Sequence, residues 1–372
     1  LYGFVPIETP LIEFDELMRP DILPSEESDE AVSERFKLED RGGRKLGLRY
    51  ELTFQLSRIF KENPNIKLPF KRYQIGEVFR DEPTSTERFR QFTQCDIDII
   101  GDPSIKADAE CLSVFSEILK ELNIEAEIVV NNLTLLNSII ESVQIKKARN
   151  VIREIDKINK IGIDQVKLNL KKYASTNQII TLFKLLEKDI YFFKENAFLG
   201  VESVIELFEF AKKYAFKIKF DPSLARGLSY YTGNVFEIKE GKSSIAGGGR
   251  YDNSVGKYLN KQLPALGISF GLERLTQSAK ISISQTPKVI IISINQDESS
   301  IKLSKKLRKS EVSCSIEFGK TSKALEYANS TSIPFVIFLG EKEIESKKFK
   351  LKDMKSGEEL MLTESQLIKK LS

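Results

Sequence analysis

Two neighbouring stretches in which apolar and polar residues alternate place the strongest constraint on the fold. They are KRYQIGEVFRDE (71–82) and RFRQFTQCDIDIIG (88–101), joined by the polar segment EPTSTE. A period of two predicts half-buried strands, and the polar loop between them predicts an antiparallel pair. The even-numbered side chains would then share one face, which carries Arg80, Glu82, Arg88, Arg90, Phe92 and Gln94. A face this charged is either solvated or a functional site, and we favour a site.

The absence of histidine limits the chemistry that the chain can perform. None of the 372 residues is a histidine, which excludes Ser-His-Asp catalysis, Cys-His pairs, HExxH zinc sites and histidine proton shuttles. Catalysis has to use Arg, Lys, carboxylates, Tyr, backbone groups or a metal held by oxygen atoms. Reliance on Arg and carboxylates is typical of reactions that stabilise charge on phosphate.

Composition indicates a globular chain of about two to three domains, since 41% of the residues are hydrophobic and 30% are charged. A net charge of only +3 means that a polyanion would need a local basic patch. The widely spaced Cys95, Cys111 and Cys314 argue against a disulfide framework and favour a reducing, cytoplasmic compartment. No apolar run predicts a membrane helix, and the first residues lack the layout of a signal peptide. The chain does not begin with Met, so we expect an N-terminal segment to precede it.

Periodicity outlines the rest of the chain. A helix is predicted at 52–62, with Thr53 as its cap and Glu51 as a helix-start carboxylate. Residues 135–215 have helical spacing and predict a helical insertion, which we interpret as a packed subdomain without chemistry of its own. After a Ser-rich linker at 278–288, alternating strand and helix patterns predict a small α/β domain with a mainly parallel sheet.

Three segments between the insertion and the linker combine glycines with polar residues. LARGLSYYTGNVFEI (224–238) sets one arginine and two tyrosines in a strand-like context. GGGRYD (247–252) offers glycines for a tight turn or for close approach to a ligand. LGISFGLERL (266–275) predicts a strand that enters a helix at Gly271, with Arg274 in the first turn. Taken alone, a structural strand accounts for Arg226, and an exposed helix face accounts for Arg274.

Taken together and in order, these segments resemble a known enzyme family. FVPIETP, the strand pair at 71–101 and GISFGLERL resemble motifs 1, 2 and 3 of class II aminoacyl-tRNA synthetases. LARGLSYYTGNVFEI and GGGRYD are similar to the two signature segments of histidyl-tRNA synthetases. LRYELT and QCDIDIIG resemble the archaeal and eukaryotic branch of that family. Class I synthetases are disfavoured independently, because their HIGH signature needs histidines.

The resemblance implies an α+β fold in which a class II antiparallel catalytic sheet is flanked by helices. The implied domains are a catalytic core at 1–134 and 216–279, a helical insertion at 135–215, and a C-terminal α/β anticodon-binding domain at 287–372. In that last domain KLSKKLRKS supplies either a basic patch or a solvated helix face, and the resemblance favours the patch. The implied reaction ligates L-histidine to tRNA(His) by way of a histidyl-adenylate. It uses ATP with bound Mg²⁺, and the implied working unit is a homodimer.

The resemblance also implies roles for individual residues. Arg80 and Arg226 would be catalytic, on opposite sides of the α-phosphate of ATP. Glu82 would accept from the adenine amino group, Phe92 and Arg274 would stack on the adenine, and Arg88, with Arg90, would assist the pyrophosphate or the tRNA acceptor strand. The α-amino group of histidine would be held by Glu51, Thr53 and Gln94, and its ring nitrogens by Asp98 and Tyr231. The full implied histidine-binding set is Glu51, Leu52, Thr53, Gln94, Asp98, Arg226, Tyr230, Tyr231 and Tyr251.

Two positions depart from the family pattern. Ser229 stands where an acidic residue is common, and Glu87 stands where glycine is usual. Two related functions stay open beside the synthetase. One is the regulatory subunit of ATP phosphoribosyltransferase, a silent paralogue that senses histidine, and the other is a synthetase-like domain that binds tRNA without charging it. Retention of Arg80, Arg226 and Arg274 disfavours both, and the C-terminal domain disfavours the first.

Overall fold

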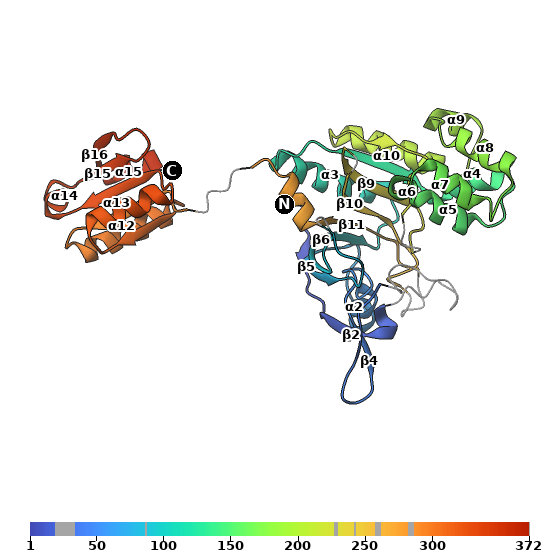
Figure 1. Ribbon diagram of the computed structural model, residues 1–372, viewed down its shortest axis with the longest axis horizontal. Helices are drawn as coiled ribbons and strands as arrows, with labels where there is room; N and C mark the ends of the chain where they lie inside the picture. Colours follow the sequence, from blue (N-terminus) through green and yellow to red (C-terminus); the bar gives the residue numbers. More distant parts are fainter. Residues whose placement is uncertain are drawn as a thin grey trace. The chain divides into compact units, whose positions relative to one another are not determined.

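The computed structural model describes residues 1–18, 34–85, 88–226, 230–241, 243–256, 262–281 and 286–371 (Figure 1). The chain divides into two compact units, Leu1–Lys280 and Ile281–Ser372. Within the described ranges, no helix is long and apolar enough to cross a bilayer. Cys95, Cys111 and Cys314 are free thiols.

An eight-stranded sheet forms the centre of the first unit. Its strands follow the order β1-β5-β6-β11-β10-β9-β7-β8, and neighbours are antiparallel except for β1–β5 and β7–β8. The predicted antiparallel pair is confirmed as β5 and β6, which pair over their whole length. The strands are β1 (Val5–Pro6), β5 (Phe70–Phe79), β6 (Gln91–Ile100), β7 (Glu127–Asn132), β8 (Lys219–Phe220), β9 (Asn234–Glu240), β10 (Ser243–Arg250) and β11 (Ala265–Gly271).

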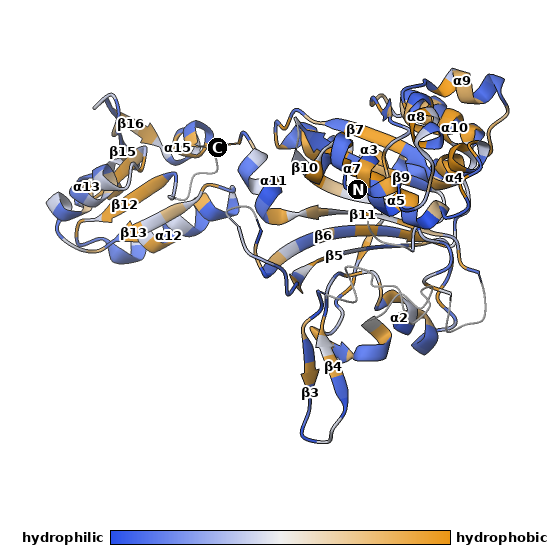
Figure 2. Cartoon of the chain, turned by 45° about the vertical axis from the view of Figure 1, so that its right-hand side comes forward, coloured by the Kyte–Doolittle hydropathy of each residue, from blue (hydrophilic) through white to orange (hydrophobic). Residues whose placement is uncertain are grey.

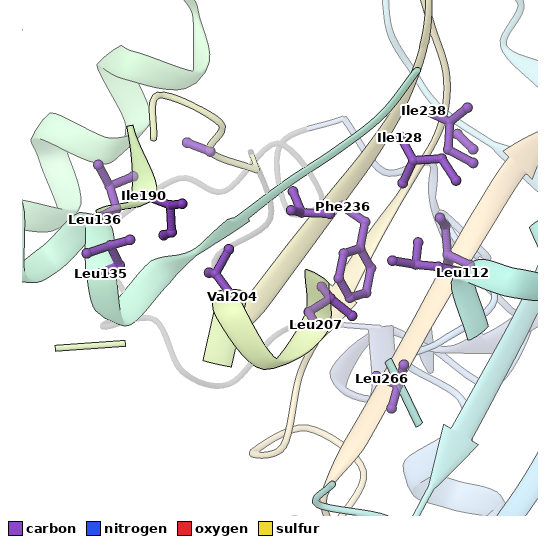
Figure 3. Close-up of a cluster of buried hydrophobic side chains, with 14 of the residues drawn as sticks. Leu112, Ile128, Leu135, Leu136, Ile190, Val204, Leu207, Phe236, Ile238 and Leu266 are labelled. Atoms are coloured by element: carbon purple, nitrogen blue, oxygen red, sulfur yellow. The ribbon is translucent and has the colours of Figure 1, made fainter. Parts of the chain in front are cut away.

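One face of this sheet is apolar and packs against helices. Phe236 on β9 and Leu266 on β11 belong to a buried cluster with Leu112 of α3 (Ile105–Glu121) and Leu207 of α10 (Val201–Lys213), as Figure 3 shows. Each buried apolar side chain contributes about 1.5–3 kcal/mol relative to an exposed one. Because side chains alternate between the two faces of a strand, packing this face on helices sends the intervening residues to the opposite face.

The segment between β7 and β8 is helical, as its spacing predicts. α4 begins where the side-chain oxygen of Asn132 accepts hydrogen bonds from the backbone N–H groups of Thr134 (2.8 Å) and Leu135 (3.3 Å). Leu135 and Leu136 of α4 continue the buried cluster that covers the sheet (Figure 3). The helices before α10 are α4 (Leu133–Ser142), α5 (Ala148–Asp156), α6 (Ile158–Ile161), α7 (Ile163–Leu170), α8 (Thr176–Leu185) and α9 (Ile190–Glu195).

A buried polar network ties the start of these helices to the sheet. Asn132 donates to the side-chain oxygen of Asn234 (2.8 Å), and Asn234 donates to Asp108 on α3 (3.1 Å). Arg250 donates to Asp108 through two nitrogens, at 2.6 and 2.9 Å. Any of these groups would be costly to bury unpaired, so the network fixes β9 and β10 against α3. The arginine of GGGRYD therefore has a structural role.

A small three-stranded sheet lies beside the eight-stranded sheet. Its hairpin of β3 (Lys37–Glu39) and β4 (Lys45–Leu48) projects away from the larger sheet (Figures 1 and 2). The prediction that a helix begins at 52 with Thr53 as its cap is wrong. The helix begins at Leu56, because the carboxylate of Glu51 instead accepts hydrogen bonds from the N–H groups of Thr53 and Phe54 and holds 51–55 in a turn. The elements are β2 (Ile12–Phe14), η1 (Asp15–Met18), β3 (Lys37–Glu39), β4 (Lys45–Leu48) and α2 (Leu56–Glu62).

The second unit alternates strands and helices around a five-stranded sheet of order β13-β12-β14-β15-β16. The prediction of a mainly parallel sheet is wrong, since β12 pairs parallel with β13 and β14 but β15 pairs antiparallel with β14 and β16. The turn between β15 and β16 is too short for the crossover that a parallel pair requires. The elements are β12 (Val289–Ser293), α12 (Asp297–Lys309), β13 (Cys314–Glu317), α13 (Thr321–Ser330), β14 (Phe335–Leu339), α14 (Glu341–Ser346), β15 (Lys348–Asp353), β16 (Glu359–Thr363) and α15 (Glu364–Leu371).

In the first unit, the short helix α11 (Leu272–Ser278) follows β11.

Candidate active site

The second face of the eight-stranded sheet is polar. Figure 2 shows three of its strands, β5, β6 and β11, side by side. Residues that lie opposite one another in register share this face across five strands: Arg72, Gln74, Gly76 and Val78 on β5, Phe92, Gln94, Asp96 and Asp98 on β6, Gly267 and Ser269 on β11, Gly247 and Gly249 on β10, and Glu237 on β9. The even-numbered side chains of β5 and β6 thus share one face, as the alternation predicts.

Two glycines leave room on this face for charged side chains. A Cβ atom on Gly247 would overlap the guanidinium of Arg226, and one on Gly267 would overlap the carboxylate of Asp98. The glycine run of GGGRYD lies within β10, so the alternative of a tight turn is excluded for Gly247, and close approach of another group explains it.

Arg226 lies over β10, facing Glu237 of the neighbouring strand. Its Nη1 is 3.7 Å from Oε1 of Glu237, which also pairs with Lys239 at 2.9 Å. Burial opposes the positive charge, but Tyr231, Glu237 and Asp156 outweigh that effect and hold the pKa of Arg226 above its usual value. Arg226 is therefore a permanent cation, with a side chain that is 25% exposed. Asp156 belongs to α5, so the helical insertion reaches this part of the site.

Arg80 directly follows β5 and lies between two aromatic rings. Its Cζ is 4.4 Å from the ring centroid of Tyr50 and 4.9 Å from that of Phe92. Beyond it, Arg88 Nη1 is 3.5 Å from Glu82 Oε2, which makes a partly exposed charged pair at the end of the two strands. Arg80 follows β5, whereas Arg226 lies over β10, three positions away in the strand order.

Arg274 lies in the first turn of α11, as predicted from Gly271. Its Nη1 donates to the backbone oxygen of Ser244 at 2.8 Å. The neighbouring Glu273 accepts from the backbone N–H of Thr93 at 2.9 Å, which pins the start of α11 beside Phe92. The structure thus sets Arg274 next to the strand that carries Phe92, while its described hydrogen bond is to β10.

The turn at 51–55 carries the predicted ligands of an amino group. Glu51 is buried, and burial raises the pKa of its carboxyl group against the opposing hydrogen bonds from Phe54 and Thr53. Leu52 contributes its backbone oxygen, which accepts from Nη2 of Arg72 at 3.0 Å. Gln94 lies on β6 with a buried side-chain oxygen that no described group donates to.

Asp98 is the centre of a buried cluster on the same face. The hydroxyl of Tyr251 donates to Oδ1 of Asp98, and Arg72 Nη2 lies 2.5 Å from its Oδ2. The ring of Tyr230 packs on Tyr251, with centroids 5.8 Å apart, and on Tyr231, with centroids 4.7 Å apart. The structure therefore brings the predicted ring-binding residues together.

Several buried polar atoms on this face lack a partner among the described residues. They are Nε of Arg80, Nε of Arg226, Oε1 of Gln94, and Nε and Nη1 of Arg72. Buried donors and acceptors are almost always paired in folded proteins, because leaving one unpaired costs about 1–3 kcal/mol. The unpartnered atoms of Arg80 and Arg226 are donors and that of Gln94 is an acceptor, which indicates a ligand that offers both acceptor oxygens and a donor group.

Four residues of the site, Arg72, Tyr50, Glu237 and Asp96, are not among those expected from the sequence. Arg72 has the same parity on its strand as Arg80, so that signal was present in the sequence. Asp96 lies opposite Gln74 and Ser269, and burial raises the pKa of its carboxyl group to about 7 although Arg72 lowers it. Tyr50 and Glu237 had no comparable signal, because their positions depend on segments distant in the sequence.

Two predicted features lie outside the described residues, namely Ser229 and Glu87. Within the ranges that are described, no group of three His, Cys, Asp or Glu side chains could hold a metal ion. The acidic residues of the site face pair with arginine, lysine, tyrosine or serine instead.

Comparison with known families covers nearly the whole chain. The family model described as Histidyl-tRNA synthetase matches residues 1–275, and the model described as Anticodon binding domain matches residues 288–372. Among curated proteins, histidine–tRNA ligase 1 of Bacillus cereus is 40% identical, covering 98% of this chain and 89% of the relative. Histidine–tRNA ligase of Clostridium tetani is 34% identical, covering 99% of this chain and 90% of the relative.

Solved structures agree with these matches. Histidyl-tRNA synthetase from Nostoc sp. PCC 7120 superimposes with a TM-score of 0.85 and 28% identity, covering 100% of this chain and 91% of that one. An ATP phosphoribosyltransferase regulatory subunit/histidyl-tRNA synthetase from Bacillus halodurans has a TM-score of 0.70 at 22% identity, over 88% of each chain, and shows a likeness of fold alone. These named relatives are bacterial, so the resemblance to the archaeal and eukaryotic branch stays a prediction. Because both family models match in order and a relative is 40% identical over 98% of this chain, the chain belongs to the histidyl-tRNA synthetase family.

Proposed function

We propose that the polar face of the eight-stranded sheet is where this chain activates histidine. The chain is a histidine–tRNA ligase: it uses ATP to join L-histidine to tRNA(His) by way of a histidyl-adenylate. One observation carries the assignment of the site. Arg80, Arg226 and Gln94 present buried polar atoms without partners on the face that also carries Asp98 and Glu51. A substrate with both phosphate oxygens and an amino group supplies the missing partners.

Activation needs charge stabilisation and no strong base. The carboxylate oxygen of histidine forms a bond to the α-phosphorus of ATP, and the bond from that phosphorus to the pyrophosphate oxygen breaks. Arg80 and Arg226 stabilise the negative charge that spreads over the α-phosphate, since forked guanidinium donors match phosphate oxygens. The rings of Tyr50 and Phe92 hold the Arg80 side chain in place before the reaction. The missing side chain of Gly247 leaves the room that the Arg226 guanidinium occupies.

Other residues bind the rest of ATP. Glu82 accepts from the adenine amino group, Phe92 and Arg274 lie against the adenine, and Arg88 assists the pyrophosphate end. What supports these roles is that α11 is pinned beside the strand of Phe92 and that Arg88 lies next to Glu82. Mg²⁺ would come with ATP as part of the substrate and offset charge on its phosphates, while Arg80 and Arg226 act on the α-phosphate.

Histidine is recognised at both ends. The buried carboxylate of Glu51, with Thr53 and Gln94, holds the α-ammonium group, and Leu52 lines the same turn. Asp98 and Tyr231 bind the two ring nitrogens, while Tyr230 and Tyr251 form the walls. An apolar amino acid has no ring nitrogens to match the buried polar groups of Asp98 and Tyr231, and a pocket whose polar groups are left unmatched rejects such a substrate.

Histidine-dependent exchange of pyrophosphate into ATP tests this function against its two rivals. We expect exchange that requires histidine, does not require tRNA, and is followed by transfer to tRNA(His). A regulatory paralogue, or a domain that only binds tRNA, would give no exchange above the rate without histidine. Folded protein that binds histidine and still gives no exchange at saturating ATP would overturn the assignment of this face as catalytic.

The three parts of the chain have different roles in this proposal. We propose that the sheet with its flanking helices, at 1–134 and 216–279, performs the chemistry, and that the insertion at 135–215 borders it near Arg226. The unit at 287–372 reads the anticodon, with the basic residues of α12 facing the RNA. A cytoplasmic location follows from the substrate, tRNA(His), and accords with the free cysteines.

We propose further that the working unit is a homodimer formed at the β1 edge. β1 is the edge strand of the eight-stranded sheet, and on the face of β5 opposite the site Tyr73 and Ile75 are 37% and 58% exposed. Val5, Leu11, Ile12 and Phe14 add further exposed apolar surface nearby in the chain. An edge strand with unpaired backbone groups beside exposed apolar side chains favours aggregation, and a second copy of the chain would cover both.

The change Ile75→Asp is expected to convert the dimer into a monomer in sedimentation velocity, because it sets a charge in the covered apolar surface. Ile180→Asp is the matched control, since Ile180 is 49% exposed on α8, away from β5. It is expected to leave the sedimentation coefficient unchanged. An unaltered coefficient for Ile75→Asp would place the interface elsewhere, and a monomeric parent protein would contradict the dimer itself.

A further inference from the structure

Arg72 is a fully buried cation on the site face to which no role has been given above. It is 0% exposed, and Asp98 directly opposite it on β6 is 2% exposed. Arg72 Nη2 lies 2.5 Å from Oδ2 of Asp98 and donates to the backbone oxygen of Leu52 at 3.0 Å. One guanidinium group therefore connects the proposed ring-binding carboxylate with the turn that holds the α-amino group.

The charges around this pair are unbalanced. Four groups face Arg72: Asp98 and Asp96 from β6, Glu51 from the turn at 51–55, and the hydroxyl of Tyr251. Burial raises the pKa of Asp98, and Arg72 and the Tyr251 hydroxyl oppose that rise. Arg72 supplies the positive charge that faces these four groups. Without it, the three carboxyl groups would be buried together without that charge, and each would favour its protonated form.

We propose that Arg72 is a positioning residue for histidine recognition that acts through Asp98. It keeps the Asp98 side chain ionised and oriented, so that its carboxylate can accept a hydrogen bond from the imidazole N–H of the substrate. The inference rests on the proposed role of Asp98 in reading the ring. Arg72 does not touch the reacting atoms, so its loss should affect histidine binding and leave ATP binding unchanged.

Arg72→Met removes the charge and keeps most of the side-chain length. We expect the KM for histidine to rise by about tenfold or more near pH 7, with the KM for ATP within about twofold of the parent value. Loss of the Arg72 charge raises the pKa of Asp98 further and shifts its carboxyl group toward the neutral acid, which is a poor acceptor. The ratio of the variant KM to the parent KM for histidine should therefore fall as the pH is raised from about 6 to about 9. Using the ratio cancels the titration of free histidine, which affects both proteins equally.

A purely structural role for Arg72 predicts a different profile. In that case the KM ratio is raised but does not change with pH, and this outcome would overturn the proposal. Arg72→Lys keeps the charge and loses the fork, so we expect a smaller rise in KM and a ratio that is flat with pH. If Arg72→Met fails to fold, Arg72→Lys alone tests the proposal. A histidine KM ratio for Arg72→Lys that falls as the pH is raised would contradict a role for the Arg72 charge, because lysine keeps that charge. Lys71→Met is the matched control, because Lys71 precedes Arg72 and points to α3, where it pairs with Glu110 at 2.6 Å.

A double-mutant cycle with Asp98→Ala separates failure of the inference from failure of the proposed function. If Arg72 acts through Asp98, Arg72→Met adds nothing further to the histidine KM of Asp98→Ala. An added, pH-dependent effect in that background assigns the action to Asp96 or Glu51 and overturns the proposal. If Asp98→Ala alone leaves the histidine KM unchanged, the proposed ring-reading role fails first and the inference fails with it.

Discussion

Replacing Arg226 with Ala is expected to lower the rate of adenylate formation by about 10²-fold or more, the scale that follows the loss of one preorganised charge. Arg226→His is expected to do the same, because imidazole is shorter and mostly neutral near pH 7. The measurement is histidine-dependent pyrophosphate exchange at saturating ATP and histidine. The rate should fall while both KM values change little, since the arginine acts most strongly on charge that develops in the transition state.

A second variant tests position apart from charge. Gly247→Ala keeps Arg226 but inserts a Cβ atom where the guanidinium now lies. We expect a reduced exchange rate, because the arginine is displaced from its place over β10. Arg44→Ala is the control, since the Arg44 side chain is 67% exposed and its ion pair among the described residues is with Asp40. Exchange near the parent rate in a folded Arg226→Ala protein would refute the catalytic assignment.

Asp98→Ala is expected to raise the KM for histidine by about 10²-fold while the KM for ATP changes far less. The substitution removes the proposed acceptor for the ring N–H. It also leaves the buried Arg72 without its ion-pair partner and the Tyr251 hydroxyl without its acceptor. Steady-state exchange kinetics with each substrate varied in turn provide the two KM values.

Stability has to be separated from recognition in this variant. Stripping a buried arginine of its partner costs about 3–5 kcal/mol, enough to unfold a marginal domain. Asp98→Asn keeps the size of the side chain and removes only its charge, so it should retain more of the fold and still raise the KM for histidine. Equal rises in the KM for histidine and for ATP would remove Asp98 from the ring-reading role.

Much of the catalytic sheet was predictable because its signals are local. The alternation at 71–82 and 88–101 depends only on the period of a strand, and it correctly gave the pair β5–β6 and the shared face of Arg80 and Phe92. The start of α11 after Gly271 was predictable for the same reason. The start of α2 was not predictable. Either Glu51 or Thr53 could accept hydrogen bonds from the free backbone N–H groups, and the sequence is the same whether the helix begins after Thr53 or a turn forms at 51–55.

The mixed sheet of the second unit shows the same limit. Alternating strands and helices predicted its elements, but the last two strands are joined by a turn, and a turn forces them antiparallel.

The helical spacing of the insertion at 135–215 predicts a subdomain without chemistry of its own. Its Asp156 nevertheless lies near enough to Arg226 to raise that side chain's pKa, a proximity that helical spacing does not encode.

The sequence by itself determined the chemical inventory: no histidine, an arginine-rich strand pair, and glycines beside each signature segment. Only the tertiary structure decided which of these groups meet. Arg72 was visible as a residue of the right parity, yet its burial depends on the turn at 51–55, on β6 and on Tyr251, which are far apart in the chain. The physical reason is that periodicity sets the direction of a side chain within its own strand. The order of strands in the sheet, set by packing of the opposite apolar face, determines the neighbours of that side chain.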